Sequence, residues 1–391
     1  MASREKKRLR KVCLVTGTRA EYGLLKPVMD EILLSRSLEL QVVVTGMHLL
    51  PEYGRTIDLI REDGIHVDAA VPLILGGDTK SSMAASIGVG VIQLTSVFDL
   101  LDPAIVVVLG DRYEALSAAI AASYTGRVLA HIGGGDNLRA GFDEYTRHAI
   151  TKMAHLHFPS TSESANRIRK MGEKEVHAVG STAIDAIRKL LPTFSGRESI
   201  LRRYNFRRSE PLALLVYHPI STVEEQGIEG ILTALLDSRC NVIAIYPNVD
   251  PGSRHVIDEL RRVVSGAPSG TRITVVPSLP QPEYFDIMNS VDFMIGNSSS
   301  GIIETPYFRK PFIHVGERQT GRTAAGNVIY VGTGSDEIRR AIDRALHDRA
   351  FARRVRTCVN PYGSGGASRK IVSTLENLTI DDTLFKKTMP Y

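Results

Sequence analysis

The stretch from His131 to His148, HIGGGDNLRAGFDEYTRH, gathers side chains that can move protons. It follows an apolar run typical of a buried strand, and it combines three consecutive glycines with acids, arginines and histidines. Carboxylates and imidazoles can act as general acids and bases, and glycines let a ligand approach the backbone closely. We therefore predict a catalytic site here, with Asp136, Asp143 and Glu144 as candidate acids.

Helical spacing relates several of these side chains. Asp143 and Arg147 stand four residues apart, so they share one face of a predicted helix and could pair. A charged first helical turn stabilised by the helix dipole would produce the same pattern. Asp136 favours the catalytic interpretation because it stands directly after the three glycines. Acids that converge raise one another's proton affinity, so one can serve as an acid and another as a base.

Glycine-containing turns follow short apolar runs throughout the first half of the chain, beginning at Gly17, Gly46, Gly110 and Gly133. Apolar runs without alternation are typical of parallel strands that are covered on both faces. In a doubly wound sheet, ligands bind at the carboxyl ends of the strands. The pattern therefore predicts that these turns share one edge of a sheet.

These turns carry further candidates. Arg19 opens a predicted helix where free amides favour a phosphate, although an arginine capping a surface turn would look the same. His48 follows the next strand and is as often structural as catalytic. Asp111 and Arg112 directly follow an apolar run and could form only a local ion pair, but their place at the predicted ligand edge favours a catalytic role.

The second half predicts a nucleotide site. Hydroxyl groups and helix N-terminal amides suit a diphosphate, and a carboxylate can accept two hydrogen bonds from a ribose diol. The segment GNSSSGIIE supplies such groups, with Glu304 at a predicted helix start. Other candidates end neighbouring strands. The nucleotide-binding candidates of this half are His218, Asn248, Ser298, Ser299, Glu304 and Arg318.

The length of 391 residues suits two domains. We predict an α/β fold of two doubly wound, Rossmann-like domains facing a cleft, the first over residues 1–190 and the second over 212–365. A polar, arginine-rich linker is predicted over 191–211. A helix within 366–391 could pack back across the domains, and the domains should close on the nucleotide.

Composition excludes several classes of protein. Hydrophobic content of 43% and charged content of 23% are typical of a globular chain. The net charge is +5, but basic residues are dispersed and Trp is absent, so a small anionic ligand fits better than nucleic acid. The three cysteines lie far apart in the sequence without paired spacing, which argues against a zinc site and against a disulfide framework. The apolar run after the basic N-terminus is too short for a signal peptide, so we predict a cytoplasmic protein without a membrane partner.

Taken together, the motifs resemble those of the hydrolysing UDP-N-acetylglucosamine 2-epimerases of sialic-acid biosynthesis. The matching segments run in order along nearly the whole chain: TGTRAEYG, TGMHL, GDRYEAL, HIGGGD, RHAITKMAHLHF, YHP, YPNVDPGS, GNSSSGIIE and GERQTGR. The resemblance implies a GT-B-like fold and a homodimer or homotetramer. It also implies that the enzyme needs no cofactor and no obligatory metal.

The resemblance further implies a reaction on UDP-N-acetylglucosamine or a related sugar. Loss of the proton on carbon 2 eliminates the nucleoside diphosphate, and hydration of the resulting glycal yields the free 2-epimer of the N-acetylmannosamine type. By resemblance, the nucleotide contacts fall on Arg19, His218, Ser298, Ser299 and Glu304. The sugar contacts fall on His48, Asp111, Arg112, Asp143 and Glu144.

One departure from the family pattern changes the expected site. Many members carry HIEGGE where this chain has HIGGGD, so Gly133 replaces an expected carboxylate. Asp136, three residues later, is its predicted substitute, and the accepted sugar could be a 6-deoxy or diacetamido sugar. Three other functions fit the same motifs: a non-hydrolysing 2-epimerase, a GT-B glycosyltransferase and a non-catalytic nucleotide-sugar sensor.

Overall fold

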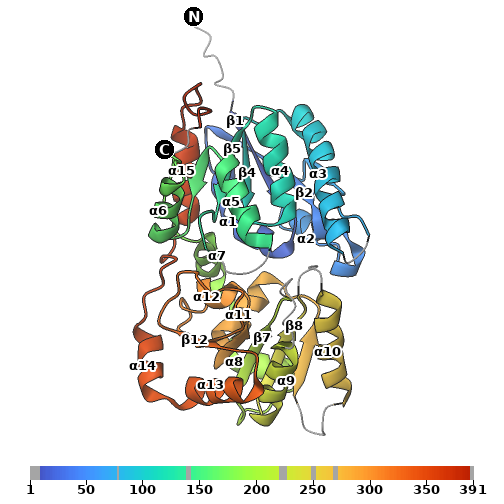
Figure 1. Cartoon of the computed structure of the whole chain (residues 1–391), viewed down its shortest axis with the longest axis vertical. Helices are drawn as coiled ribbons and strands as arrows, with labels where there is room; N and C mark the ends of the chain where they lie inside the picture. The colour runs from blue at the N-terminus through green and yellow to red at the C-terminus, as the bar shows by residue number, and fades with distance from the viewer. Residues whose placement is uncertain are drawn as a thin grey trace, which may run out of the picture. The chain divides into compact units, whose positions relative to one another are not determined.

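The computed structural model describes residues 9–76, 79–137, 142–219, 227–247, 252–266 and 272–387, without the side chains of Phe142 and Asp143. Asn248 and the Asp143 side chain, both predicted site groups, therefore lie outside the described residues. The chain divides into two compact units, each built on a six-stranded parallel sheet (Figure 1). The first unit comprises Met1–Asp136, Tyr145–Ala186 and Gly365–Tyr391, and the second comprises Asn137–Glu144 and Ile187–Ser364.

The sheet of the first unit has the strand order β3-β2-β1-β4-β5-β6, which is the doubly wound order expected for a Rossmann-like domain. Its strands are β1 (Arg10–Thr16), β2 (Leu38–Thr45), β3 (Ala69–Val71), β4 (Ile105–Leu109), β5 (Val128–Ile132) and β6 (Leu156–Phe158). Its helices are α1 (Arg19–Leu33), α2 (Ile57–Glu62), α3 (Lys80–Leu101), α4 (Tyr113–Tyr124), α6 (Ser162–Lys170) and α15 (Ala367–Asn377), with short 3-10 helices η1 (Gly46–Leu49) and η2 (Pro51–Tyr53). Two helices are shared with the second unit: α5 (Phe142–Met153) begins there, and α7 (Thr182–Leu190) ends there.

Both faces of this sheet are buried, which explains why its strands read as continuous apolar runs. Along β1, Val12 and Leu14 belong to the core cluster that includes residues of α1 and α15. Cys13 and Val15 point to the opposite cluster, which includes residues of α3 and α4. Alternate residues of one strand therefore hold two helical layers.

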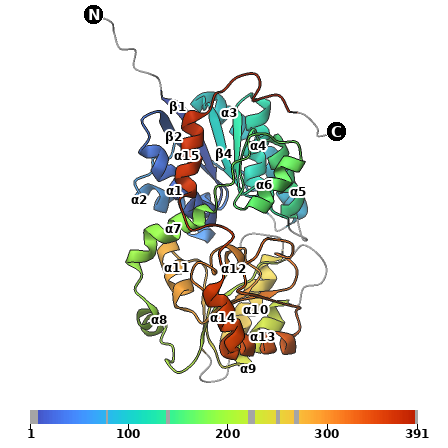
Figure 2. The same ribbon diagram turned by 90° about the vertical axis from the view of Figure 1, so that its left-hand side faces the viewer.

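Helix α15 lies beside α1 in the first unit (Figure 2). The Arg10 guanidinium donates to the carbonyl of Leu375 over 2.7 Å, and the hydroxyl of Ser35 donates to Glu376 over 2.5 Å. At the helix start, the carboxylate of Asp185 accepts hydrogen bonds from the amide and hydroxyl of Ser368 over 2.7 and 2.8 Å. The C-terminal segment, which follows the second unit in the sequence, therefore belongs to the first unit.

The second sheet repeats the same winding, with the order β12-β11-β10-β7-β8-β9. Its strands are β7 (Leu212–Val216), β8 (Asn241–Ile245), β9 (Ile273–Val276), β10 (Phe293–Gly296), β11 (Phe312–Val315) and β12 (Val328–Val331). The accompanying helices are α8 (Arg197–Arg203), α9 (Gly227–Asp237), α10 (Ser253–Gly266), α11 (Gln281–Ser290), α12 (Ser300–Ile303), α13 (Ser335–His347) and α14 (Arg349–Thr357). The predicted α/β class with two doubly wound sheets is confirmed.

The segment predicted as a linker, 191–211, groups with the second unit. It contains the 3-10 helix η3 (Leu191–Thr193) and helix α8, which packs against α11. The Asp286 side chain on α11 accepts hydrogen bonds from the amide and hydroxyl of Ser195, over 2.6 and 2.7 Å. Polar residues of the segment 191–211 therefore make hydrogen bonds within the second unit.

The order of each sheet reverses beside its first strand, and this switch point is where open α/β sheets bind ligands. In the first unit, β1 and β4 are neighbours there, so the turns at Gly17 and Gly110 meet. In the second unit, β7 and β10 are neighbours, so the loops at His218 and Asn297 meet. Both switch points coincide with segments predicted to form sites.

Candidate active site

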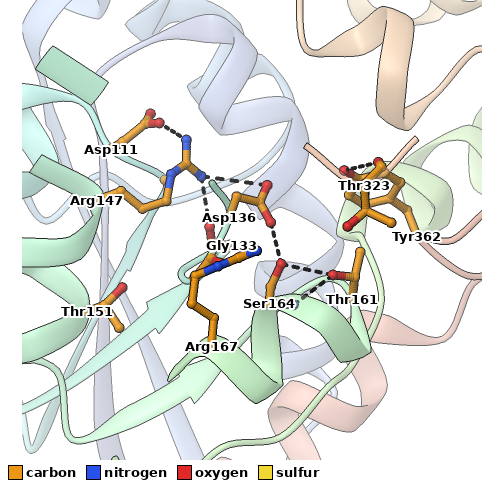
Figure 3. A network of polar contacts seen from close by, with 12 residues as sticks. Asp111, Gly133, Asp136, Arg147, Thr151, Thr161, Ser164, Arg167, Thr323 and Tyr362 are labelled. Atoms are coloured by element: carbon orange, nitrogen blue, oxygen red, sulfur yellow. Dashed lines mark hydrogen bonds and ion pairs between the residues drawn. The ribbon is translucent and has the colours of Figure 1, made fainter. Parts of the chain in front are cut away.

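Arg147 is the centre of the polar cluster in the first unit (Figure 3). Its side chain is 4% exposed, and its guanidinium donates to the carboxylate of Asp111 and, over 3.0 Å, to the carbonyl of Gly133. The carboxylate of Asp136 lies 3.8 Å away. One guanidinium on α5 therefore joins groups that follow β4 and β5. We call Asp111, Gly133, Asp136, Arg147 and Ser164 the Arg147 cluster.

Asp136 is held from its other side by α6. Its Oδ1 accepts a 2.6 Å hydrogen bond from the hydroxyl of Ser164, and the Asp136 side chain is 7% exposed. Ser164 in turn contacts the hydroxyl of Thr161, the N-cap residue of α6. Both carboxylate oxygens thus face protein groups, so the geometry favours a positioning role for Asp136. Asp111, at 18% exposure, is the more open carboxylate.

Glycine is favoured at the three positions of the GGG motif for different structural reasons. A Cβ on Gly134 or Gly135 would lie under 3.0 Å from neighbouring atoms, so these two positions need glycine for packing. Gly133 has φ of 76°, yet the nearest atom to a Cβ there would be 4.0 Å away. A side chain at 133 would have room but would be strained by the left-handed backbone. The backbone itself therefore favours glycine where the family pattern led us to expect a carboxylate.

A second buried charge group lies under the turns after β1 and β2. Arg112 pairs with Glu114 through two contacts of 3.1 and 3.2 Å, and the Glu114 side chain is 1% exposed. Glycine is required at Gly17 and Gly46, where a Cβ would lie within 3.0 Å of Glu114. Arg112 is thus engaged by a neighbouring carboxylate, which favours a supporting role over contact with a substrate.

The turn after β1 already holds an internal carboxylate. Glu21 accepts hydrogen bonds from the amides of Gly17 and Thr18 over 2.9 and 3.1 Å. Burial, and next the charge of Glu114, raises the pKa of Glu21 to about 7. Two amides expected to be available for an anion are therefore occupied. Arg19 is half-buried at the first position of α1.

His48 and His131 are buried and neutral near pH 7. His48 lies between the hydroxyls of Thr16 and Thr56, at 3.1 and 2.7 Å, and burial lowers its pKa to about 4. His131 contacts the carbonyl of Gly110 at 2.7 Å and a threonine of α5, and burial lowers its pKa to about 3. Both imidazoles connect loops to the sheet. The geometry thus favours the structural alternative for His48.

Asn297 is the centre of a polar cluster in the second unit. It is fully buried, and its side chain exchanges two hydrogen bonds with the backbone of His218, of 2.7 and 2.8 Å. Its own carbonyl accepts from Gln319 over 3.2 Å and from Arg318 over 3.4 Å. Three loop segments therefore converge on one amide side chain and its backbone. We call His218, Asn297, Ser298, Arg318 and Gln319 the Asn297 cluster.

The serine segment after Asn297 begins a helix of four residues, α12. Ser298 is buried, and Ser299 is the N-cap residue. Our prediction that Glu304 begins the helix was wrong, because α12 ends at Ile303 and Glu304 is its C-cap residue. Burial raises the pKa of Glu304 to about 7. Its Oε2 atom has no hydrogen-bond partner among the residues that the structure describes.

Sequence reasoning missed several residues of both clusters. Arg147 was considered only as a partner of Asp143, because helical spacing reveals neighbours on one helix and not the strand ends beside it. Ser164 and Glu114 gave no signal beyond helix capping and charge. Asn297 and Gln319 stood inside recognised motifs, and their position next to predicted strands was the available signal. Glu144 lies half-buried on α5.

Comparison with known proteins relates the whole chain to one family. A family profile described as UDP-N-acetylglucosamine 2-epimerase matches residues 31–376. A UDP-N,N'-diacetylbacillosamine 2-epimerase (hydrolyzing) of Legionella pneumophila is 35% identical over 98% of this chain and 100% of that protein. A UDP-N-acetylglucosamine 2-epimerase of Neisseria meningitidis is 32% identical over 86% of this chain and 88% of that protein.

Solved structures agree in fold. The UDP-GlcNAc 2-epimerase of Neisseria meningitidis bound to UDP-GlcNAc superposes with a TM-score of 0.79 at 20% identity, covering 93% of this chain and 99% of that chain. The profile match and the full-length relatives together establish the relationship that the motifs indicated. This chain belongs to the UDP-N-acetylglucosamine 2-epimerase family and is an enzyme of the nucleotide-sugar 2-epimerase type.

Proposed function

We propose that this enzyme is a hydrolysing 2-epimerase of a UDP-linked acetamido sugar. The observation that carries this proposal is the Arg147 cluster, in which one buried guanidinium contacts Asp111, beside the sheet switch point, and lies 3.8 Å from Asp136, which follows the neighbouring strand. Such an arrangement holds a carboxylate in a fixed direction, as proton abstraction requires. Two relatives that cover 98% and 96% of the chain are named as hydrolyzing enzymes, which supports the hydrolytic outcome.

In the proposed reaction, Asp111 accepts the proton from carbon 2 of the sugar. The bond between carbon 1 and the diphosphate oxygen breaks, UDP leaves, and a double bond forms between carbons 1 and 2. Water then adds its hydroxyl to carbon 1, while carbon 2 receives a proton on the opposite face. Asp143 and Glu144 are the proposed groups for this second proton and for the activation of water.

The Asn297 cluster is proposed to bind the nucleotide. Its buried amides and hydroxyls are donors and acceptors that do not titrate, and Arg318 adds a cation suited to the diphosphate. Glu304 offers a carboxylate oxygen without a partner among the described residues, which suits a ribose diol. Arg19 remains a proposed contact to the nucleotide, as does Asn248 beyond the described part of the chain.

A 2,4-diacetamido sugar is our first candidate for the substrate, with N-acetylglucosamine as the second. The names of the relatives in Legionella pneumophila and Campylobacter jejuni support the former. The departure at Gly133 also supports it, because the side chain of the family pattern is missing on this face of the cluster. We further propose a cytoplasmic homo-oligomer. All three cysteines are free, as a reducing compartment would keep them.

The test is to incubate the enzyme in D₂O with UDP-N,N'-diacetylbacillosamine and, separately, with UDP-N-acetylglucosamine, and to follow both by NMR. A free 2-epimer carrying one deuterium on carbon 2, together with UDP, supports the proposal. An epimer that stays linked to UDP indicates the non-hydrolysing enzyme. Sugar transfer that needs an added acceptor indicates a glycosyltransferase, and binding without turnover indicates a sensor.

A further inference from the structure

Helices α5 and α6 together hold the Arg147 cluster. Arg147 itself lies on α5, and Ser164 on α6 donates the 2.6 Å hydrogen bond that holds Asp136. Arg167, also on α6, donates to the carbonyl of Gly135. The 3.8 Å separation between the guanidinium of Arg147 and the carboxylate of Asp136 therefore depends on how α5 lies against α6.

The C-terminal ends of these two helices meet at a buried carboxylate, Glu173. This residue follows Met171, the C-cap residue of α6, and its side chain is 5% exposed. Lys152, in the last turn of α5, donates to Glu173 over 2.7 Å and to the carbonyl of Met171 over 2.9 Å. His157 of β6 lies 3.3 Å from the same carboxylate. One acid thus joins the end of α5, the end of α6 and an edge strand of the sheet.

The C-terminal segment brings a second cation to this carboxylate. Lys387 donates to Glu173 over 2.6 Å, and its side chain is 25% exposed. Its ammonium also donates to the carbonyl of Lys152, over 2.6 Å, and to that of Ala154. The last carbonyls of a helix have no partner within it, so a lysine that reaches them caps the helix and complements its dipole. We call Lys152, Glu173 and Lys387 the Glu173 cluster.

Apolar contacts anchor the C-terminal segment directly before Lys387. Leu384 packs against the core of the first unit, and Phe385 lies edge-on against the imidazole of His155, with ring centres 4.9 Å apart. The Nδ1 atom of His155 accepts a 3.0 Å hydrogen bond from the amide of Leu129 in β5. Figure 2 shows this segment leaving α15 and passing to the side of the unit where α5 and α6 lie. Lys387 is therefore delivered to the helix ends by a segment that is itself packed.

We propose that Lys387 is a positioning residue, which fixes α5 against α6 through the Glu173 cluster and so holds Arg147 at its distance from Asp136. The inference rests on the proposed function in assigning proton transfer to the Arg147 cluster. Helices tied to one buried carboxylate cannot slide past each other without separating its charge pairs, which is costly at low exposure. A contact that only stabilised the fold would join the C-terminal segment to the core, as Leu384 does, whereas Lys387 joins the two helix ends.

Lys387→Met tests this role, because it removes the ammonium and keeps an unbranched side chain. We expect kcat of UDP release to fall about tenfold, with KM and UDP affinity within about twofold of the wild-type values, because a small misplacement of positioned groups slows the chemical step. Lys386→Met, at the exposed neighbour, is the matched control and should keep the wild-type kcat. Arg10→Met removes a contact between β1 and α15, so it should lower the melting temperature but not kcat.

Chemical rescue separates the charge at this position from the packing. In a Cys358→Ser background the remaining native cysteines, Cys13 and Cys240, are buried. Lys387→Cys should lose activity as Lys387→Met does, and alkylation with 2-bromoethylamine, which rebuilds an ammonium of nearly the same length, should restore most of the lost rate. Alkylation with iodoacetamide adds a neutral group and should restore none. Equal recovery with both reagents would overturn the proposal.

Two further measurements test the connection between the helices. Lys387→Met combined with Glu173→Gln should be about as slow as the slower single variant, because both changes break the same contact. Hydrogen exchange without substrate should be faster in α5 and α6 of Lys387→Met than in the wild type, and unchanged in α1. Unchanged kcat in Lys387→Met, additive losses in the double variant, or unchanged exchange in α5 and α6 would each overturn the proposal. A wild type that released no UDP would contradict the proposed function, and the exchange comparison would still decide the positioning role.

Discussion

The two polar clusters of this protein are built from different chemical groups. In the Arg147 cluster a buried cation faces two carboxylates. The Asn297 cluster contains no carboxylate, and its groups are two side-chain amides, a hydroxyl, an imidazole, one arginine and backbone groups. Charged groups can exchange protons and hold a proton acceptor ionised. Neutral donors and acceptors bind without changing charge. Under the proposed function, this difference implies a division of labour, in which the Arg147 cluster takes part in proton transfer and the Asn297 cluster recognises the nucleotide.

Removing the most exposed carboxylate of the Arg147 cluster should give the largest effect. We expect Asp111→Asn to lower kcat by about 1,000-fold, because the amide cannot accept the proton from carbon 2. UDP affinity, measured by titration calorimetry, should stay within error of the wild-type value. Asp58→Asn, an exposed acid on α2, serves as the control. A large loss of UDP affinity in Asp111→Asn would contradict the proposed division of labour.

Asp136→Asn should have a smaller effect on turnover, about 100-fold, through the orientation of Arg147. A positioning residue leaves the proton acceptor in place, so the acidic limb of the pH profile of kcat should persist in this variant. The measurement is kcat against pH for wild type and variant. Disappearance of that limb would make Asp136 the proton acceptor itself, in the place of the carboxylate that Gly133 lacks.

The Asn297 cluster should respond in the opposite way. Asn297→Ala leaves the buried backbone groups of His218 without partners, which should cost about 3 kcal/mol in the free energy of unfolding. We expect UDP affinity to fall about tenfold, while kcat at saturating substrate changes by less than about threefold. Denaturant unfolding and calorimetry measure these quantities. The exposed Asn377→Ala is the control, and equal losses in both variants would refute the assignment.

The smallest expected effect concerns pH. Burial raises the pKa of Glu304 to about 7 from its ordinary value of 4.5, so the folded protein binds its proton more tightly than the unfolded chain. This contribution to stability is present below pH 4.5 and is lost as the pH rises through about 7. Melting temperatures across this window should therefore fall less steeply in Glu304→Gln than in the wild type. Identical slopes would show that Glu304 titrates normally.

Much of the fold could be predicted because its signals are local. Apolar runs, glycine turns and helical periodicity indicated two doubly wound units and placed Asp111, Asp136 and His218 near strand ends. The predicted linker did not anticipate α8, because the apolar side chains Ile200 and Leu201 that bury this helix stand within an arginine-rich segment. Short elements in polar surroundings give weak periodic signals, since about two turns of helix place few apolar residues on one face.

By itself, the sequence determined which residue types reach the ends of parallel strands, because side-chain periodicity and turn chemistry act over a few residues. Only the tertiary structure decided which groups pair. Arg147 contacts Asp111 and Gly133, which are distant from it in sequence. A buried guanidinium is costly unless acceptors pair with it, and folding brings these two acceptors to it. The positive φ of Gly133 likewise follows from how its strand end turns between neighbouring loops. Pairing and backbone conformation depend on long-range packing, and no local pattern reports them.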